Sequence, residues 1–245
     1  MDKTMMLTSS LMCYEKEKGE IISVEMQNVN ALISNINDNL PTRNKMVYIM
    51  ANPYRYSLND SLFEVTRQSF QMSDIVFNEY KLIDYRYTGD LWKELRWTDL
   101  IILGGGDCEP QLAFFKILGL KGLLGSYKGL IIGRSAGTMG MATEVYCCPE
   151  FEQHKYDRKF AEGLGLTNIM TLPHYSRYKD KQLWGRKLIE DIVFNDIKDK
   201  TLYVLDDGSY ILIKDGKSVV FGLAYIITNK TISKICENGE TYVIK

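Results

Sequence analysis

A short apolar run at residues 130–132 leads directly into residues 133–137, which read Gly-Arg-Ser-Ala-Gly. The run is typical of a buried strand, and the small or unbranched residues that follow the serine favour a helix. A sharp strand-to-helix turn with the pattern Gly-x-Ser-x-Gly is the setting of a nucleophile elbow, which exposes its serine at a strained backbone position. Glycine-rich turns of this kind are also common without any catalytic role. The motif alone therefore leaves both interpretations of Ser135 open.

Short apolar segments alternate with amphipathic segments along most of the chain. The predicted strands cover residues 4–8, 46–50, 79–83, 99–103, 130–132 and 167–172. The predicted helices cover residues 25–40, 57–72, 91–95, 110–118 and 180–194. Strands and helices in alternation predict a mainly parallel sheet with helices on both faces, which is an α/β fold.

The pattern changes after residue 200, where short β-segments are separated by turns. These segments cover residues 201–205, 209–214, 218–223 and 240–244, and residues 13–24 and 144–162 are expected to be loops. The simplest arrangement for the C-terminal segments is an antiparallel β extension of the parallel sheet. Because no linker, repeat or low-complexity tract occurs, residues 1–245 are expected to form a single domain.

Composition disfavours several classes of protein. The chain has 30 Lys and Arg against 31 Asp and Glu, so its net charge of −1 does not indicate a nucleic-acid or membrane partner. No apolar run is long enough for a transmembrane helix or, at the start, for a signal peptide, so a cytoplasmic location is expected. The five cysteines show no Cys-x-x-Cys spacing. Reduced thiols and no metal site are therefore expected. No cofactor is expected either, and the protein is expected to be a monomer or a homodimer.

Three polar motifs come directly after predicted strands, namely residues 104–107, Ser135 and His174. Ligands of such sheets bind beyond the carboxyl ends of the strands, so these motifs are expected to meet at one edge. A serine is a weak nucleophile unless a base takes its proton. His174 follows an apolar strand directly, whereas His154, the other histidine, lies in a charged run that is expected to face solvent. The sequence therefore predicts His174 as the base for Ser135, with capping of the strand as its structural alternative.

A third, acidic group is needed to orient the base and to stabilise the imidazolium. Four acidic residues between the serine and the histidine are candidates, namely Glu144, Glu150, Glu152 and Asp157. The residues themselves do not decide among them. The glycines at 104–106 bring bare backbone to the same edge, where an N–H from this loop and the N–H of Ala136 are expected to form an oxyanion hole. The loop lacks the spacing of a P-loop or of a dinucleotide site, which disfavours nucleotide binding.

Five short pieces of the chain occur in the order that is found in one known family. They are Ile-Ile-Leu-Gly-Gly-Gly-Asp at 101–107, Gly-Arg-Ser-Ala-Gly at 133–137, Gly-Leu-Gly-Leu at 163–166, Leu-Pro-His-Tyr at 172–175 and Leu-Asp-Asp-Gly at 205–208. With these pieces the chain, from about residue 46 onward, resembles the peptidase E (aspartyl dipeptidase) and cyanophycinase family of serine peptidases. The resemblance implies a flavodoxin-like three-layer fold related to class I glutamine amidotransferases, with serine in place of their cysteine.

The resemblance also implies a role for each member of the predicted site. Ser135 is the expected nucleophile and His174 the expected base. Glu150 lies 15 residues after Ser135, where peptidase E has its aspartate, so it is the first choice for the acid, with Glu144 in reserve. The implied oxyanion donors are the backbone amides of Gly105, Gly106 and Ala136.

Other positions depart from the family pattern. Asp107 stands where the peptidase E branch usually has asparagine, and Arg134 occupies a position that is often Trp, Thr or Leu. These positions border the substrate, so the specificity of peptidase E for aspartyl peptides is not carried over. Arg134 and Arg177 are candidates for binding a substrate carboxylate, because a guanidinium binds a carboxylate through two parallel hydrogen bonds. Surface arginines with no such role are the alternative.

The expected function is hydrolysis of peptide bonds in small peptides by a serine peptidase of dipeptidase or exopeptidase type. An esterase of the α/β-hydrolase type is disfavoured, because its histidine usually lies near the chain end and His174 follows Ser135 by only 39 residues. A glutamine amidotransferase is disfavoured because residue 135 is not cysteine. A non-catalytic binding or regulatory module on the same scaffold is the remaining alternative, since a fold alone does not establish chemistry.

Overall fold

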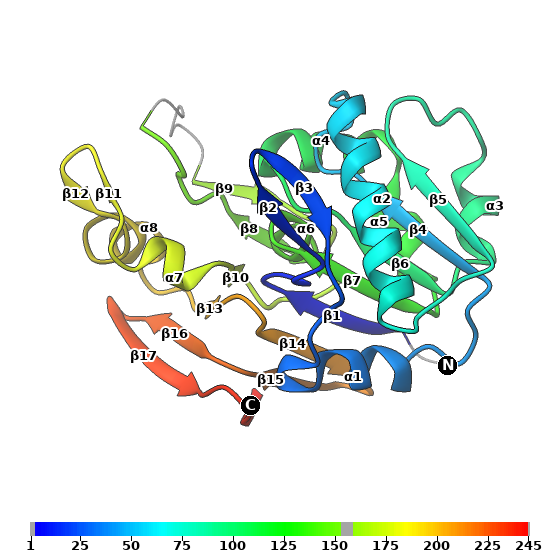
Figure 1. The fold of residues 1–245 in the computed structure, drawn as a ribbon. Helices are drawn as coiled ribbons and strands as arrows, with labels where there is room; N and C mark the ends of the chain where they lie inside the picture. Colours follow the sequence, from blue (N-terminus) through cyan, green and yellow to red (C-terminus); the bar gives the residue numbers. More distant parts are fainter. Residues whose placement is uncertain (1–2, 153–158, 245) are drawn as a thin grey trace.

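A central sheet of eight strands forms the body of the protein, whose computed structural model describes residues 3–152 and 159–244 (Figure 1). The strand order is β18-β15-β14-β1-β7-β6-β4-β5. In that order the strands are Thr241–Ile244, Lys217–Phe221, Tyr210–Lys214, Thr4–Thr8, Leu130–Arg134, Leu100–Leu103, Lys45–Ile49 and Glu79–Ile83. Neighbouring strands from β1 to β5 run parallel, whereas β14, β15 and β18 are added antiparallel beside β1. The predicted parallel sheet with an antiparallel C-terminal extension is confirmed.

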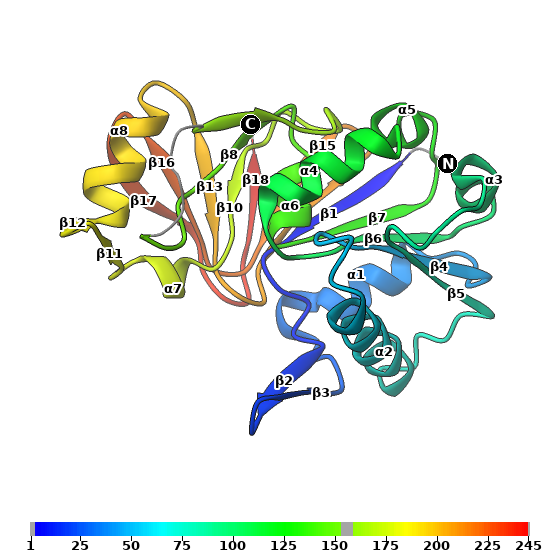
Figure 2. The same cartoon turned by 90° about the horizontal axis from the view of Figure 1, so that it is seen from above.

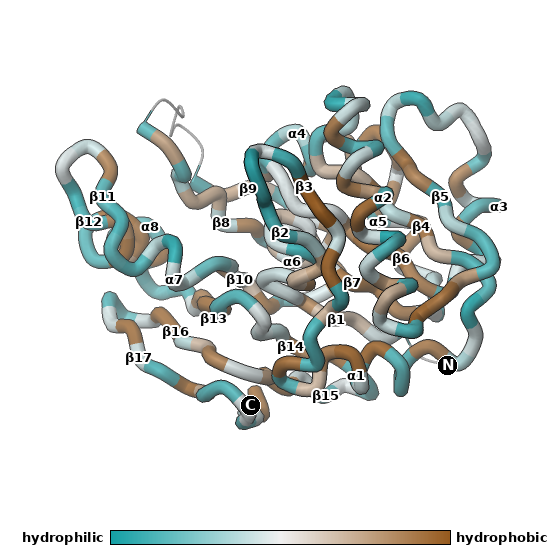
Figure 3. Tube along the Cα trace, viewed as in Figure 1, coloured by the Kyte–Doolittle hydropathy of each residue, from teal (hydrophilic) through white to brown (hydrophobic). Residues whose placement is uncertain are grey.

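Helices cover both faces of this sheet, as Figure 2 shows. One face carries α1 (Leu32–Asp38) and α2 (Tyr56–Met72), and the other carries α3 (Leu91–Arg96), α4 (Cys108–Ile117), α5 (Leu120–Gly125) and α6 (Ala136–Gly140). Successive side chains of a strand point to opposite faces. Tyr48 and Ile102 accordingly pack into the core under α1 and α2, while Ile49 and Leu103 pack into the core on the other face. The three-layer, flavodoxin-like α/β fold is confirmed, and β6 and β7 are among the brown, hydrophobic stretches of Figure 3.

A second, four-stranded sheet lies beside the first. Its order is β10-β13-β16-β17, with bounds Thr171–Leu172, Leu202–Leu205, Ala224–Thr228 and Thr231–Cys236. Here β10 and β13 run parallel, and the remaining pairs are antiparallel. The prediction that residues 201–205 extend the main sheet is therefore wrong. These residues leave it because Leu202 and Val204 bury their side chains in a separate core, together with the π-helix η2 (Leu188–Val193) and α8 (Phe194–Ile197).

Three hairpins replace segments that the sequence analysis assigns to loops or to a helix. They are β2 (Tyr14–Glu17) with β3 (Glu20–Ser23), β8 (Glu144–Tyr146) with β9 (Phe160–Glu162), and β11 (Gln182–Leu183) with β12 (Arg186–Lys187). The first hairpin turns through Lys18 and Gly19, whose φ values of 50° and 89° suit the right-handed twist of a tight hairpin. It projects from the sheet and packs against α2 (Figure 2).

Two predicted helices differ from the observed ones, whereas the helix predicted at 57–72 is confirmed as α2. Residues 180–194 are not one helix, because Trp184 and Gly185 adopt φ values of 52° and 69° and close the β11–β12 hairpin. The helix expected at 25–40 begins only after Asn30 and Ala31, which also have positive φ. Asn30 is held there by donating a hydrogen bond to the Gly208 carbonyl at 2.9 Å. None of the helices in the described ranges is long and apolar enough to span a membrane.

Candidate active site

Ser135 occupies the sharp turn between β7 and α6, with φ 52° and ψ −117°. Its N–H donates to the Thr8 carbonyl of β1 at 3.0 Å, which ties the turn to the neighbouring strand. The glycines on either side are sterically required. A methyl group on Gly137 would lie 2.1 Å from the Leu103 carbonyl oxygen, and one on Gly133 would lie 2.6 Å from the next helix turn. The strand, strained serine and helix of a nucleophile elbow are thus all present.

His174 lies directly beyond β10 and faces Ser135. Its Nε2 is 2.8 Å from the Ser135 Oγ, and its side chain is only 11% exposed. The histidine backbone is in the left-handed region, with φ 62°, and its N–H donates to the Ser9 Oγ at 2.9 Å. Ser9 follows β1, so the first strand of the chain helps to hold the histidine. The structure thus places Ser135 and His174 within hydrogen-bond distance, as the sequence analysis expects.

The acidic partner of His174 is Asp207. The Nδ1 atom lies 2.6 Å from the Asp207 Oδ1, and the Ser9 hydroxyl donates to the same oxygen at 2.9 Å. Burial alone raises the pKa of Asp207, but the hydrogen bonds from His174 and Ser9 and the charges of His174 and Arg177 outweigh it and lower this pKa below its ordinary value. A carboxylate at Nδ1 favours the tautomer that leaves Nε2 free to accept the serine proton.

The turn that carries Asp207 connects the two sheets, because β13 ends just before it and β14 begins just after it. Strands β10 and β13 are parallel, with Leu172 opposite Val204, so the residues beyond their carboxyl ends meet. The neighbouring Asp206 accepts hydrogen bonds from the Ser176 N–H at 3.0 Å and from its hydroxyl at 2.7 Å. This contact anchors α7 (Tyr175–Tyr178), which begins directly after the histidine.

The prediction of Glu150 as the acid is wrong, and so is the reserve choice of Glu144. Glu150 lines a cavity with Tyr178, a buried side chain whose pKa is raised by burial and by the charge of this carboxylate. Glu144 is ion-paired with Lys200 at 2.5 Å. The Nδ1 of His174 is bonded to neither of them but to the acid after β13.

The two other candidates for the acid are Glu152 and Asp157. Glu152 accepts a hydrogen bond from the Trp184 N–H at 2.8 Å, so it too has another partner. Asp157 and the second histidine, His154, lie outside the described residues. Within the described ranges, no group of three or more His, Cys, Asp and Glu side chains is arranged to hold a metal ion.

The glycine-rich loop after β6 lies against the serine. A methyl group on Gly105 would be 3.1 Å from the Ser135 Cβ, and one on Gly106 would be 2.8 Å from the Ala51 Cβ. A side chain at position 106 would therefore collide with Ala51, and one at position 105 would crowd the serine. The N–H groups of Gly105 and Ala136 donate to no backbone carbonyl elsewhere in the part of the chain that the structure describes. They are consequently free to donate to a substrate.

The two arginines predicted to bind a substrate carboxylate lie in different surroundings. Arg134 is only 7% exposed, and its guanidinium donates to the hydroxyls of Tyr14 at 2.7 Å and Tyr48 at 3.3 Å. It also lies 4.9 Å from the centre of the Tyr14 ring. The prediction for Arg134 is therefore wrong, because its side chain enters the core under α1 and α2. Arg177 is exposed on α7, and its charge contributes to the lowered pKa of Asp207.

A cavity of about 310 Å³ opens beside the serine. Its walls come from the loop before α4, from α6, from the segment after β8 and from the end of β10. They comprise Gly106, Asp107, Cys108, Glu109, Pro110, Ala136, Met139, Cys147, Cys148, Pro149, Glu150, Leu172 and Tyr178. Ala136 adjoins Ser135, and Leu172 lies two residues before His174. The cavity is thus placed to receive part of a molecule that is bound at the serine.

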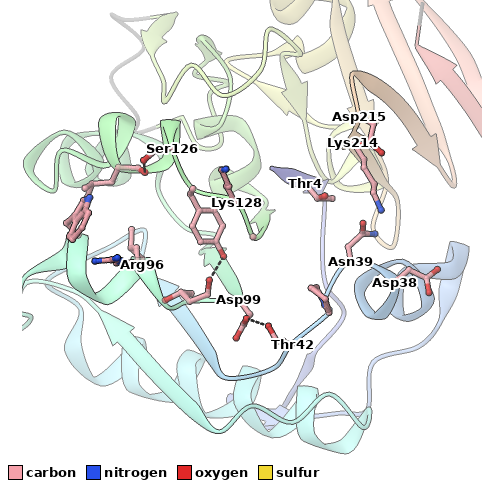
Figure 4. Close-up of a pocket in the computed structure, with 17 residues that line it drawn as sticks. Thr4, Asp38, Asn39, Thr42, Arg96, Asp99, Ser126, Lys128, Lys214 and Asp215 are labelled. Atoms are coloured by element: carbon pink, nitrogen blue, oxygen red, sulfur yellow. Dashed lines mark hydrogen bonds between the residues drawn. The ribbon is translucent and has the colours of Figure 1, made fainter. Parts of the chain in front are cut away.

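A larger cavity of about 610 Å³ lies at the opposite edge of the sheet (Figure 4). Its lining includes Thr4, Asp99 and Gly129, which stand at or before the beginnings of strands rather than after their ends. The Asp99 carboxylate is already used, because it accepts hydrogen bonds from the Thr42 hydroxyl and from the N–H of Lys45. The amino ends of parallel strands are not the usual place for ligands. The candidate active site is therefore the smaller cavity.

A serine, a histidine and an acid in hydrogen-bond contact are the arrangement that serine hydrolases use. The sequence profile of peptidase family S51 matches residues 22–221. The chain therefore belongs to this family, and the protein is a serine peptidase. The resemblance to peptidase E that the sequence motifs indicate is confirmed.

Two solved structures share the fold. A peptidase from an acI-B1 Actinobacterium is 14% identical and superposes with a TM-score of 0.69 over 100% of this chain and 98% of its own. A putative peptidase E protein from Listeria monocytogenes EGD-e is 19% identical, with a TM-score of 0.58 over 89% of this chain and 97% of its own. At these identities the likeness shows the fold alone. Among curated protein sequences, none matches this chain significantly.

Proposed function

We propose that the protein hydrolyses peptide bonds in small peptides, as a dipeptidase or exopeptidase, through Ser135, His174 and Asp207. The observation that carries this proposal is the continuous chain of contacts between them, 2.8 Å from serine to histidine and 2.6 Å from histidine to aspartate. The neighbouring cavity of about 310 Å³ is at the lower end of the range for small-molecule sites, which favours a short substrate.

The first half of the reaction forms an acyl-enzyme. The Ser135 Oγ attacks the scissile carbonyl carbon while its proton passes to the Nε2 of His174. Asp207 stabilises the resulting imidazolium through Nδ1 and keeps the ring in place. The intermediate then collapses, the C–N bond breaks, and the proton on Nε2 passes to the leaving amine. In the second half, water attacks the acyl ester with His174 again acting as the base.

The negative charge of each tetrahedral intermediate needs donors on the carbonyl oxygen. The N–H groups of Gly105 and Ala136 are the proposed donors, because they flank Ser135 and are not used by the backbone. The N–H of Gly106 is the alternative partner from the same loop. These donors are fixed by the strand ends, so they need no rearrangement when the charge develops.

The experiment that tests the proposal is a mass-spectrometric screen of a mixed dipeptide and tripeptide library with wild type and Ser135→Ala. Cleavage by the wild type alone is expected, and the products identify the preferred bond. Cleavage by both proteins, or by neither, would contradict the proposal. A parallel assay on p-nitrophenyl esters separates an esterase, which would cleave the esters and leave every peptide intact.

A further inference from the structure

The cavity beside Ser135 has a carboxylate in its wall. Glu150 lines it together with Tyr178, a side chain only 2% exposed. The negative charge of Glu150 is near enough to contribute, after burial, to the raised pKa of Tyr178. Glu150 is thus a charge in the wall of the cavity, although it is not the partner of His174.

The rest of the wall suits an aliphatic chain. Met139 and Leu172 are buried apolar residues, and Pro110 and Pro149 add further carbon surface. No lysine or arginine lines this cavity within the described part of the chain. A cavity whose wall has apolar residues and carboxylates but, among its described residues, no cation is complementary to a side chain that has a long hydrocarbon stem and a positive end.

Most other charges near the cavity are negative. Two more acids, Asp107 and Glu109, lie in the wall. Asp107 has Arg55 at 4.0 Å, but both side chains are more than half exposed, and such a pair is weak. Lys181 lies over the ring of Tyr178 at 5.5 Å and lines a neighbouring cavity with Glu150, but it is not part of this wall.

We propose that Glu150 is a specificity-determining residue, which selects peptides whose scissile carbonyl belongs to a lysine or arginine residue. This inference rests on the proposed function, because it names the substrate class of the same site. The side chain that enters the cavity belongs to the residue with the scissile carbonyl, since the cavity wall includes Gly106 and Ala136 beside the proposed oxyanion donors. The hydrocarbon stem of this substrate side chain packs on Met139 and Leu172, while its positive end binds the carboxylate of Glu150.

The same arrangement disfavours acidic substrates. An aspartyl side chain in this cavity would bring a second negative charge toward Glu150, and neither predicted arginine compensates for it. The Arg134 guanidinium donates to two tyrosine hydroxyls in the core under α1 and α2. Arg177 does not line the cavity. We therefore expect aspartyl peptides to be poorer substrates than neutral ones.

The test compares lysyl-alanine with norleucyl-alanine, which has nearly the same shape but no charge on its side chain. In the wild type, kcat/KM for the lysyl peptide is expected to exceed that for the norleucyl peptide by at least about tenfold, as for a hydrogen bond to a charged group. Glu150→Gln should reduce this ratio to about one while leaving the norleucyl rate within about threefold. The matched control Glu162→Gln, on an exposed acid paired with Lys121, should keep the wild-type ratio.

Binding to Ser135→Ala separates the inference from the proposed function. By calorimetry this variant is expected to bind lysyl-alanine at least about tenfold more tightly than norleucyl-alanine, and Ser135→Ala/Glu150→Gln is expected to lose the difference. Equal cleavage of both peptides by the wild type would overturn the inference and leave the peptidase intact. If neither peptide is cleaved but Ser135→Ala keeps its preference, the proposed function fails and the role of Glu150 stands. Equal binding of both peptides overturns that role.

Discussion

Replacing Asp207 by alanine is expected to lower kcat/KM by about 10²- to 10³-fold with little change in KM. When His174 takes the serine proton it becomes an imidazolium, and its Nδ1 lies 2.6 Å from the Asp207 carboxylate. With charge centres about 4 Å apart and an effective dielectric constant near 20, their attraction is worth about 4 kcal/mol. That energy corresponds to a factor of about 10³ in kcat/KM. Because the Asp207 side chain is 48% exposed, solvent screens part of it, which sets the lower limit.

The assay is steady-state hydrolysis of a neutral peptide identified in the library screen, with thermal unfolding to verify that each variant is folded. Asp199→Ala removes an exposed aspartate elsewhere and should retain the wild-type rate. Glu150→Gln should also stay within about threefold of wild type on this neutral substrate. The reasoning fails if Asp207→Ala keeps nearly full activity while Glu150→Gln loses a hundredfold, since Glu150 would then be the acid that orients His174.

Three further predictions concern the scaffold around the site. Gly137→Ala should lower the free energy of unfolding by at least about 3 kcal/mol in denaturant titrations, because its methyl group would lie 2.1 Å from a carbonyl oxygen, whereas Gly122→Ala, with open space around it, should be neutral or stabilising. Ser9→Ala should lower kcat about tenfold and leave the unfolding temperature nearly unchanged, because the lost hydroxyl bridges the acid and the histidine backbone; unchanged kcat would contradict this. Burial raises the pKa of Asp84, but hydrogen bonds from Arg86 outweigh it and hold this pKa below its ordinary value, so the stabilisation is present above about pH 4 and is lost as the pH falls through the native pKa. Urea titrations from pH 3 to 7 should therefore show Arg86→Gln less stable than the wild type at neutral pH, with the gap closing in acid.

The parts of the fold that depend on local sequence were predictable. The central strands are continuous apolar runs because both of their faces are buried, and this signal does not depend on what packs against them. The elbow was predictable for a related reason, since the glycines at 133 and 137 are imposed by backbone contacts within the strand-to-helix turn. Ser135 follows such a strand directly, so its position at the carboxyl edge followed from the sheet itself. His174 follows β10, a two-residue strand of the second sheet, so its approach to the serine depends on how the two sheets adjoin.

Asp207 was not predictable in the same way. It lies in an Asp-Asp-Gly sequence that is typical of an ordinary turn, and it follows the histidine instead of lying between the serine and the histidine. Its meeting with His174 depends on the parallel pairing of β10 with β13, and β10 has only two residues. The one local signal was that residues 205–208 form a motif shared with a known family, to which the sequence analysis gave no role.

The segment 180–194 shows how a correct pattern leads to a wrong element. Three apolar residues of the predicted helix, Leu188, Ile192 and Val193, are buried, as the spacing of an amphipathic helix would have them. Trp184, which has the same spacing, is 42% exposed, because it turns with Gly185 into a hairpin before the π-helix begins. Periodicity therefore identified which side chains enter the core but not where the backbone reverses.

The position of β1 has a consequence for the order in which the site is assembled. Its two partners in the sheet are β7, which begins at residue 130, and β14, which begins at residue 210. Contacts between such distant segments form late. Ser9 follows β1 and Asp207 precedes β14, and the two side chains are joined by a hydrogen bond. We therefore expect the hydrogen bonds of the proposed catalytic residues to form only once β1 lies between β7 and β14.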